Sequence, residues 1–166
     1  VDESYLRELI KRLNERNFDD YDNNRAMEKE KFLFTYKRYK RNPKFRRIVC
    51  RAYNNCCAMC GISLDLIEAA HIIPHSHIKG TDSINNGIAL CSIHHTSYDN
   101  ALVYFDENYY IYINNAKLKY LTKIHQDFGY QKFNSLQFKK LVLPKDKSLI
   151  PNPDNIFIAN NIRGIS

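Results

Sequence analysis

Apolar residues in the first third of the chain recur at helical spacing. From Glu3 to Arg16 apolar residues recur three and four residues apart, as in the pairs Tyr5–Leu9, Leu6–Ile10 and Ile10–Leu13. This spacing puts them on one face of an amphipathic helix. A second helix is predicted from about Arg25 to Lys40, after a polar connector over residues 17–24. A third is expected from Pro43 through Ala52, because asparagine suits the cap before a helix and proline suits its first position.

Beyond this helical region the pattern changes to short apolar runs separated by polar turns. Ile67–Ile73 is predicted to form a strand, and Ala101–Phe105 with Tyr109–Ile113 has the β-branched and aromatic residues of a hairpin. A further helix is expected around residues 117–128 and a strand near residues 138–143, followed by a tail punctuated by Pro151 and Pro153. A chain of 166 residues favours one domain with accessory elements.

The net charge of +7 is unevenly distributed. Residues 1–54 carry 15 basic and 9 acidic side chains, residues 55–110 carry 1 and 6, and residues 111–166 carry 9 and 3. The densest basic stretch has eight cations and no acid, which indicates a surface for a polyanion such as double-stranded DNA. The alternative is a solvated helix face. The eight cations are Lys37, Arg38, Lys40, Arg41, Lys44, Arg46, Arg47 and Arg51.

The sequence gives no sign of a membrane segment. No apolar run approaches the ~20 residues that a membrane-spanning helix needs, and the first residues lack the basic start of a secretory signal. We therefore expect a cytoplasmic protein with no membrane partner. Because no methionine opens the sequence, processing or a longer parent protein is expected.

Cysteine and histidine are concentrated in the acidic middle of the chain, between positions 56 and 95. An odd number of cysteines without a secretory signal argues against a disulfide framework and favours metal binding. Cys57 and Cys60 have the same two-residue spacing as Cys91 and His94, and two such pairs suit a structural, tetrahedral Zn²⁺. Cys56 competes with Cys57, which we prefer because the spacing then matches on both sides.

A second group of polar residues remains once these four are set aside: His71, Asn86, His95 and Asp99. His95 and Asp99 are four residues apart, so on a helix that starts near Ser92 they share one face and can hold one divalent cation. His94 and His95 point about 100° apart on such a helix, which separates the two metal sites.

The segment from about 54 to 114 resembles the HNH, or ββα-metal, nucleases. The resemblance rests on the AAHIIP strand with His71, on DSINNGIALC with Asn86, and on CSIHHTSYDN with His95 nine residues later. The flanks RNPKFRRIVCRAYNNCCAMCG and, more weakly, LVLPKDKSLIPNPDN are similar to restriction-type HNH enzymes. The resemblance implies an α+β fold with a small zinc-stabilised, treble-clef-like core at residues 54–114. It also implies a basic helical region at residues 1–53 and an accessory α/β segment at residues 115–166.

The resemblance also implies a function and the residues that serve it. The protein would be a one-metal DNA endonuclease, with His71 as the general base and Asn86 holding the loop that aims it. His95, with Asp99, would bind Mg²⁺, Mn²⁺ or another divalent ion, and the products would carry 5′-phosphate ends. A restriction or defence role in a prokaryotic or phage-like setting is expected, with a homodimer where both strands are cut.

One departure from the family pattern leaves alternatives open. Many relatives place a further metal ligand immediately before the general base, where this chain has Ala70. Either His75, His77 or Asp82 compensates, or the protein is a zinc-stabilised DNA-binding module without catalysis. Glu68 is expected to point away from the His71 face of the strand. A third alternative is the nuclease domain of a larger modification-dependent or signal-activated antiviral effector.

Overall fold

The computed structural model describes residues 43–165. These residues lie within the second of two units into which the chain divides, Asn42–Ser166. The helices predicted over residues 3–16 and 25–40 lie outside the described residues, as do Lys37, Arg38, Lys40 and Arg41. The domain boundaries proposed from the sequence stay predictions.

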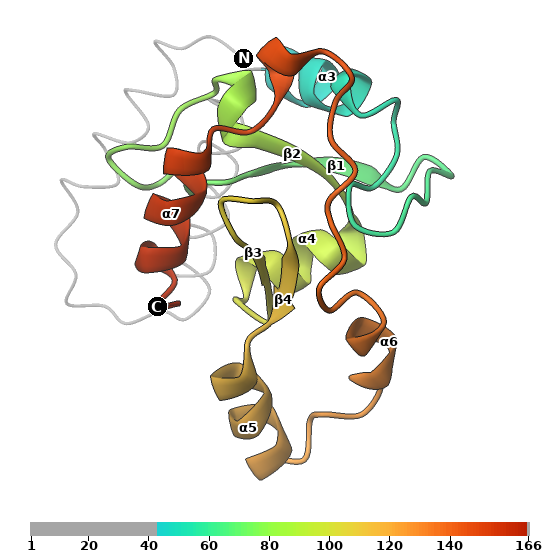
Figure 1. The fold of residues 1–166 in the computed structure, drawn as a ribbon, viewed down its shortest axis with the longest axis vertical. Helices are drawn as coiled ribbons and strands as arrows, with labels where there is room; N and C mark the ends of the chain where they lie inside the picture. Colours follow the sequence, from blue (N-terminus) through green and yellow to red (C-terminus); the bar gives the residue numbers. More distant parts are fainter. Residues whose placement is uncertain (1–42, 166) are drawn as a thin grey trace, which may run out of the picture. The chain divides into compact units, whose positions relative to one another are not determined.

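A two-stranded antiparallel hairpin forms the centre of the described unit. Strand β1 (Ile67–His71) pairs with β2 (Gly87–Cys91) in a register that sets His71 opposite Gly87. The 3-10 helix η1 (Ile84–Asn86) leads into β2. Helix α4 (Ser92–Asp99) follows β2 directly and contacts both strands (Figure 1). This β–β–α order positions the candidate site, because β1 and α4 carry its histidines.

Helix α3 (Pro43–Ala52) packs against the same hairpin. It begins at Pro43, as the Asn42–Pro43 pair predicts. The contact is close at Gly87, where a Cβ atom would lie 2.5 Å from Val49 Cγ2 and 2.9 Å from Phe45 Cζ. A side chain at position 87 would therefore push α3 away from β2.

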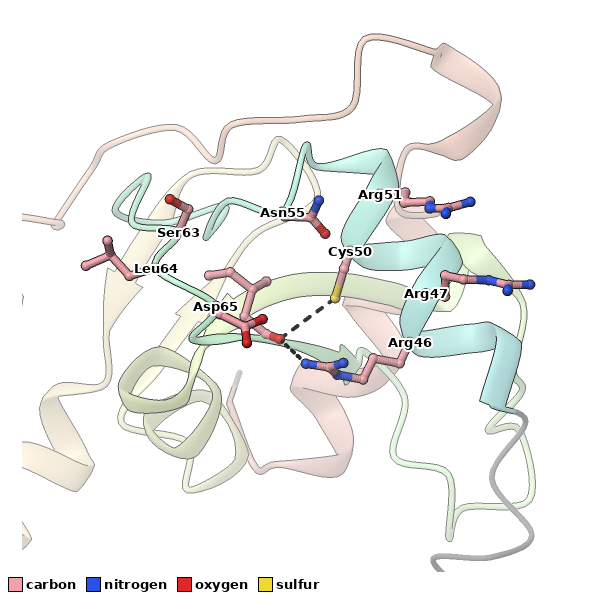
Figure 2. A pocket seen from close by; sticks show the side chains of 9 residues that line it. Arg46, Arg47, Cys50, Arg51, Asn55, Ser63, Leu64 and Asp65 are labelled. Carbon is pink, nitrogen blue, oxygen red and sulfur yellow. Dashed lines mark hydrogen bonds between the residues drawn. The ribbon is translucent and has the colours of Figure 1, made fainter.

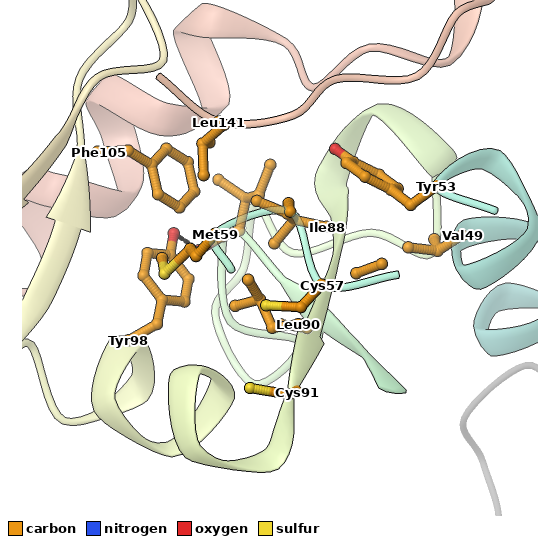
Figure 3. Packing of buried hydrophobic residues seen from close by; sticks show 14 of the residues in the cluster. Val49, Tyr53, Cys57, Met59, Ile88, Leu90, Cys91, Tyr98, Phe105 and Leu141 are labelled. Carbon is orange, nitrogen blue, oxygen red and sulfur yellow. Dashed lines mark hydrogen bonds between the residues drawn. The ribbon is translucent and has the colours of Figure 1, made fainter. Parts of the chain in front are cut away.

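The core joins these elements to the second half of the unit. Side chains from α3, β2 and α4 meet Phe105 and Leu141 in one buried cluster (Figure 3). Tyr98 and Phe105 are fully buried and stack at 5.0 Å between ring centroids. The residues after α4 are thus part of one packed core with the hairpin, and their burial stabilises it.

A second small sheet follows α4. Strands β3 (Val103–Phe105) and β4 (Ile111–Ile113) form the antiparallel hairpin that the sequence predicts. Helix α5 (Asn115–Lys123) begins after Asn114, whose side chain accepts a hydrogen bond from the Lys117 amide. It ends earlier than the predicted residue 128, and His125 has a left-handed φ of 57° just beyond it.

The predicted strand near residues 138–143 is wrong. Only an isolated bridge between Tyr110 and Lys140 forms there, after the four-residue helix α6 (Gln131–Asn134). Phe138 has a φ of 64°, which a continuous strand cannot accommodate. The segment still pairs locally with β4, since the Phe138 amide donates to the Ile111 carbonyl at 2.7 Å.

The predicted proline-punctuated tail is a helix instead. After the 3-10 helix η2 (Lys147–Leu149), helix α7 runs over Pro153–Ile162. Asn152 caps it by accepting from the Asp154 amide, and Pro153 occupies its first turn. This is the same Asn-Pro start signal that predicts α3, so the sequence contained the evidence for this helix.

The described unit has the predicted α+β class, with helices packed on two small antiparallel sheets. Within residues 43–165, none of the helices has the length and apolar character needed to cross a bilayer.

Candidate metal and catalytic site

Cys57, Cys60, Cys91 and His94 bring their ligand atoms together, all within 4.8 Å of one another. His94 Nδ1 lies 3.3 Å from the sulfur of Cys57 and 3.3 Å from that of Cys91. Sulfur atoms around one tetrahedral Zn²⁺ lie about 3.8 Å apart, because each Zn–S bond is about 2.3 Å long. The cluster therefore matches the size and donor chemistry of a structural zinc site.

Cys57, and not Cys56, is the cysteine that faces this cluster. The Cys56 thiol contacts the Asn54 carbonyl at 3.5 Å and lies outside the group of four. Burial opposes ionisation of the Cys57 thiol, but hydrogen bonds from His94 and from backbone amides outweigh it and lower its pKa to about 6. Burial raises the pKa of Cys91. A bound cation would also stabilise the thiolate forms of Cys60 and Cys91.

His71 lies at the end of β1, between an aromatic ring and a carboxylate. Its ring stacks on Phe45 with 4.1 Å between centroids and an interplanar angle of 8°. Its Nε2 is 2.9 Å from Asp82 Oδ1, and the side chain is 11% exposed. His75 meets the same carboxylate oxygen at 3.8 Å. His71 is thus held in one orientation while part of its ring faces solvent.

Asn86 closes the loop that carries Asp82. Its side chain is fully buried and makes three hydrogen bonds across the loop. Its Oδ1 accepts from the Ile73 amide at 2.9 Å, and its Nδ2 donates to the carbonyls of Ile73 (3.1 Å) and Thr81 (2.9 Å). Because Thr81 precedes Asp82, this clamp fixes the carboxylate beside His71.

His95 forms a second group on α4, between two carboxylates. Its Nε2 lies 3.3 Å from Asp99 Oδ2, and its Nδ1 lies 2.5 Å from Glu68 Oε2. Glu68 also accepts from the Ser92 hydroxyl at 3.2 Å. The hydrogen bond with His95 lowers the pKa of Glu68. Glu68 was not among the site residues predicted from the sequence. The alternation of side chains along β1 places it on the face opposite His71.

Asp99 is also approached from α7. Arg163 Nη2 lies 3.8 Å from Asp99 Oδ1, and Nη1 donates to the Ile72 carbonyl at 3.0 Å. The guanidinium lies 4.1 Å above the Tyr98 ring, and its side chain is only 6% exposed. The loop after β1, helix α4 and the end of α7 therefore meet at one buried cation. No sequence motif marked Arg163.

His75, His77 and Asp82, the candidates for the ligand missing at Ala70, lie in the loop after β1. Asp82 and His75 contact one another beside His71, and the His77 ring accepts from the Lys79 amide at 3.2 Å.

The arginines of α3 divide into two kinds. Arg46 points toward β1 and donates to the Ile67 carbonyl at 3.0 Å, whereas Arg47 and Arg51 point away from the strand (Figure 2). All three line a pocket of about 600 Å³ that also includes Asp65. The exposed guanidinium groups of Arg47 and Arg51 are suited to binding phosphate.

Comparisons with known proteins agree with this arrangement. Residues 57–106 match the sequence profile of the HNH endonuclease family, which confirms the resemblance over this segment. The fold matches a solved structure described as "Modification dependent TagI restriction endonuclease", with a TM-score of 0.54 and 19% identity. That match covers 74% of this chain and 38% of the other, so this chain spans well under half of its length. Curated proteins yield no significant match.

Proposed function

Because residues 57–106 of this chain belong to the HNH endonuclease family, we propose that the protein is a divalent-metal-dependent endonuclease that hydrolyses phosphodiester bonds in double-stranded DNA. The observation that carries the proposal is the pair of histidine groups on one hairpin–helix unit. His71 is paired with a carboxylate at the end of β1, and His95 faces Asp99 on α4.

His71 is the proposed general base. When Nε2–H donates a hydrogen bond to Asp82, the lone pair of the imidazole is on Nδ1, and that nitrogen is proposed to take the proton of the attacking water. The stacked Phe45 ring limits rotation of the imidazole. Asn86 serves this step by holding the loop around Asp82 and touches no substrate in our proposal.

His95 and Asp99 are the proposed ligands of the catalytic ion. An imidazole nitrogen and a carboxylate oxygen suit Mg²⁺ or Mn²⁺, which keeps its other positions for water and phosphate oxygens. When bound, the ion would offset the negative charge that develops on the phosphate and on the leaving 3′ oxygen. Zn²⁺ in the Cys57 cluster would be structural. Hydrolysis with this geometry is proposed to leave 5′-phosphate ends.

Plasmid cleavage tests the proposal. We expect supercoiled plasmid to be nicked or linearised with Mg²⁺ or Mn²⁺ and to stay intact with EDTA. Linear product at low enzyme excess would support a homodimer, whereas nicked product would support a single site. A protein that binds plasmid but never cuts it with any of these ions would instead be the inactive DNA-binding module.

A second candidate is the nuclease part of a larger modification-dependent or signal-activated antiviral effector. It is favoured by the fold match to 38% of the length of a modification-dependent enzyme. Comparing methylated with unmethylated plasmid in the same assay separates this candidate from a nuclease that ignores modification. A restriction or defence role is our proposal for either case.

Arg47 and Arg51 are proposed to contact the DNA backbone. Replacing both by alanine should remove about two phosphate contacts and reduce the slope of log K against log salt by about 2. Fluorescence anisotropy with a duplex at several salt concentrations measures this slope. Lys132→Ala, on exposed helix α6, is the matched control. An unchanged slope in the double variant would show that α3 does not face the DNA backbone.

A further inference from the structure

At Ala70 the chain lacks the further metal ligand that the family resemblance implies, and Glu68 lies two residues earlier on the same strand, β1. Side chains two residues apart in a strand point to the same side. Glu68 is therefore directed toward α4, as Ala70 is, but one step earlier along β1. It meets the first turn of α4 at Ser92 and His95.

Interatomic contacts indicate whether the Glu68 carboxylate is placed as a metal ligand or as a hydrogen-bond acceptor. Two ligands of one octahedral Mg²⁺ or Mn²⁺ at right angles lie about 3.0 Å apart, given bonds of about 2.1 Å. The 3.3 Å between His95 Nε2 and Asp99 Oδ2 fits such a pair. Glu68 Oε2 is in hydrogen-bond contact with His95 Nδ1, on the other side of the ring from the Nε2 that faces Asp99, so Glu68 is not placed to bind the ion that Nε2 would hold.

We propose that Glu68 is a positioning residue that accepts a hydrogen bond from the Nδ1–H of His95 and thereby aims the Nε2 lone pair at the catalytic ion. The inference rests on the proposed function, since it assumes an ion at His95 and Asp99. The Ser92 hydroxyl holds the second carboxylate oxygen and fixes the direction of the first. A carboxylate behind a metal-binding histidine sets its tautomer and raises its basicity.

A purely structural role explains the contact less well. The Glu68 side chain is 46% exposed, and an exposed ion pair contributes little to stability. Glu68→Ala should thus keep the thermal stability and zinc content of the wild type. Glu68→Ala is instead expected to weaken the binding of the catalytic ion at His95 and Asp99.

Calorimetric titration with Mn²⁺, in protein that retains its zinc, provides the first test. Glu68→Ala should weaken Mn²⁺ binding about 10–100-fold, and Glu68→Gln should recover part of the loss because its amide oxygen still accepts from Nδ1. Asp65→Asn, which removes an exposed acid just before β1, should bind Mn²⁺ as the wild type does.

The ¹⁵N spectrum of the histidine rings provides the second test, recorded at a pH above which the ring signals no longer move. The wild type should show His95 protonated at Nδ1, and Glu68→Ala should show a mixture or the Nε2 tautomer. His95→Ala assigns the signals. Wild-type Mn²⁺ affinity or an unchanged tautomer in Glu68→Ala would overturn the inference alone. Mn²⁺ binding that His95→Ala leaves intact would instead overturn the proposed function.

Discussion

Replacing Cys60 by alanine is expected to release zinc and to unfold most of the molecules at 25 °C. A metal ion held by the four residues would tie the turn at residues 57–60 to the junction of β2 and α4, and Cys57 and Cys91 are buried in the core. Structural zinc contributes on the order of 10 kcal/mol in small modules. Whole domains are stable by only about 5–15 kcal/mol. Loss of the ion therefore removes a large share of the free energy of unfolding.

Cys56→Ala is the matched control, because Cys56 is adjacent to a ligand in sequence but outside the cluster. It should retain one zinc per chain and the melting temperature of the wild type. Metal content by mass spectrometry and circular dichroism during heating measure both quantities. If Cys60→Ala melted like the wild type while holding no metal, the four side chains would be a polar cluster without a structural ion.

The cluster of Cys57, Cys60, Cys91 and His94 illustrates what sequence can predict here. Ligand spacing in a short turn is a local property, so two pairs of two-residue spacing were enough to group the four residues. Their spacing favoured Cys57 over Cys56, and the fold places Cys57 in the cluster. The hairpin at β3 and β4 and the start of α3 were predicted for the same reason, since turn and cap signals are local.

Contacts between distant segments were not predictable in this way. Glu68 meets His95 across 27 positions and Arg163 meets the Ile72 carbonyl across 91. Neither residue has a neighbour in sequence that marks it. Strand alternation placed Glu68 opposite His71, but only the packing of α4 on the hairpin shows what lies on that other face. The failed strand near Phe138 has a backbone cause, a left-handed φ that composition does not reveal.

His71→Ala is expected to reduce the rate of plasmid cleavage by about 10²–10⁴-fold, the usual contribution of a general base. DNA affinity should change little, because the cations proposed to bind the backbone lie on α3. Single-turnover cleavage with Mg²⁺ measures the rate, and anisotropy with a duplex measures the affinity. Since the imidazole stacks on Phe45, His71→Gln and a melting curve accompany the alanine variant to separate chemistry from packing.

Variants of His77 and Asp82, in the loop after β1, test whether the loss of cleavage is specific to His71. His77→Ala, in the exposed loop after β1, should cut at the wild-type rate, because within residues 43–165 the hydrogen bond of the His77 ring is a local one from the Lys79 amide. Asp82→Asn should be slowed less than His71→Ala, since the base remains but its orientation and basicity are weakened. Wild-type cleavage by a folded His71→Ala protein would exclude His71 as the base. An equal loss of cleavage rate in His77→Ala would show that catalysis depends on the loop as a whole. The hydrogen bonds by which Asn86 holds this loop would then be the feature that catalysis requires.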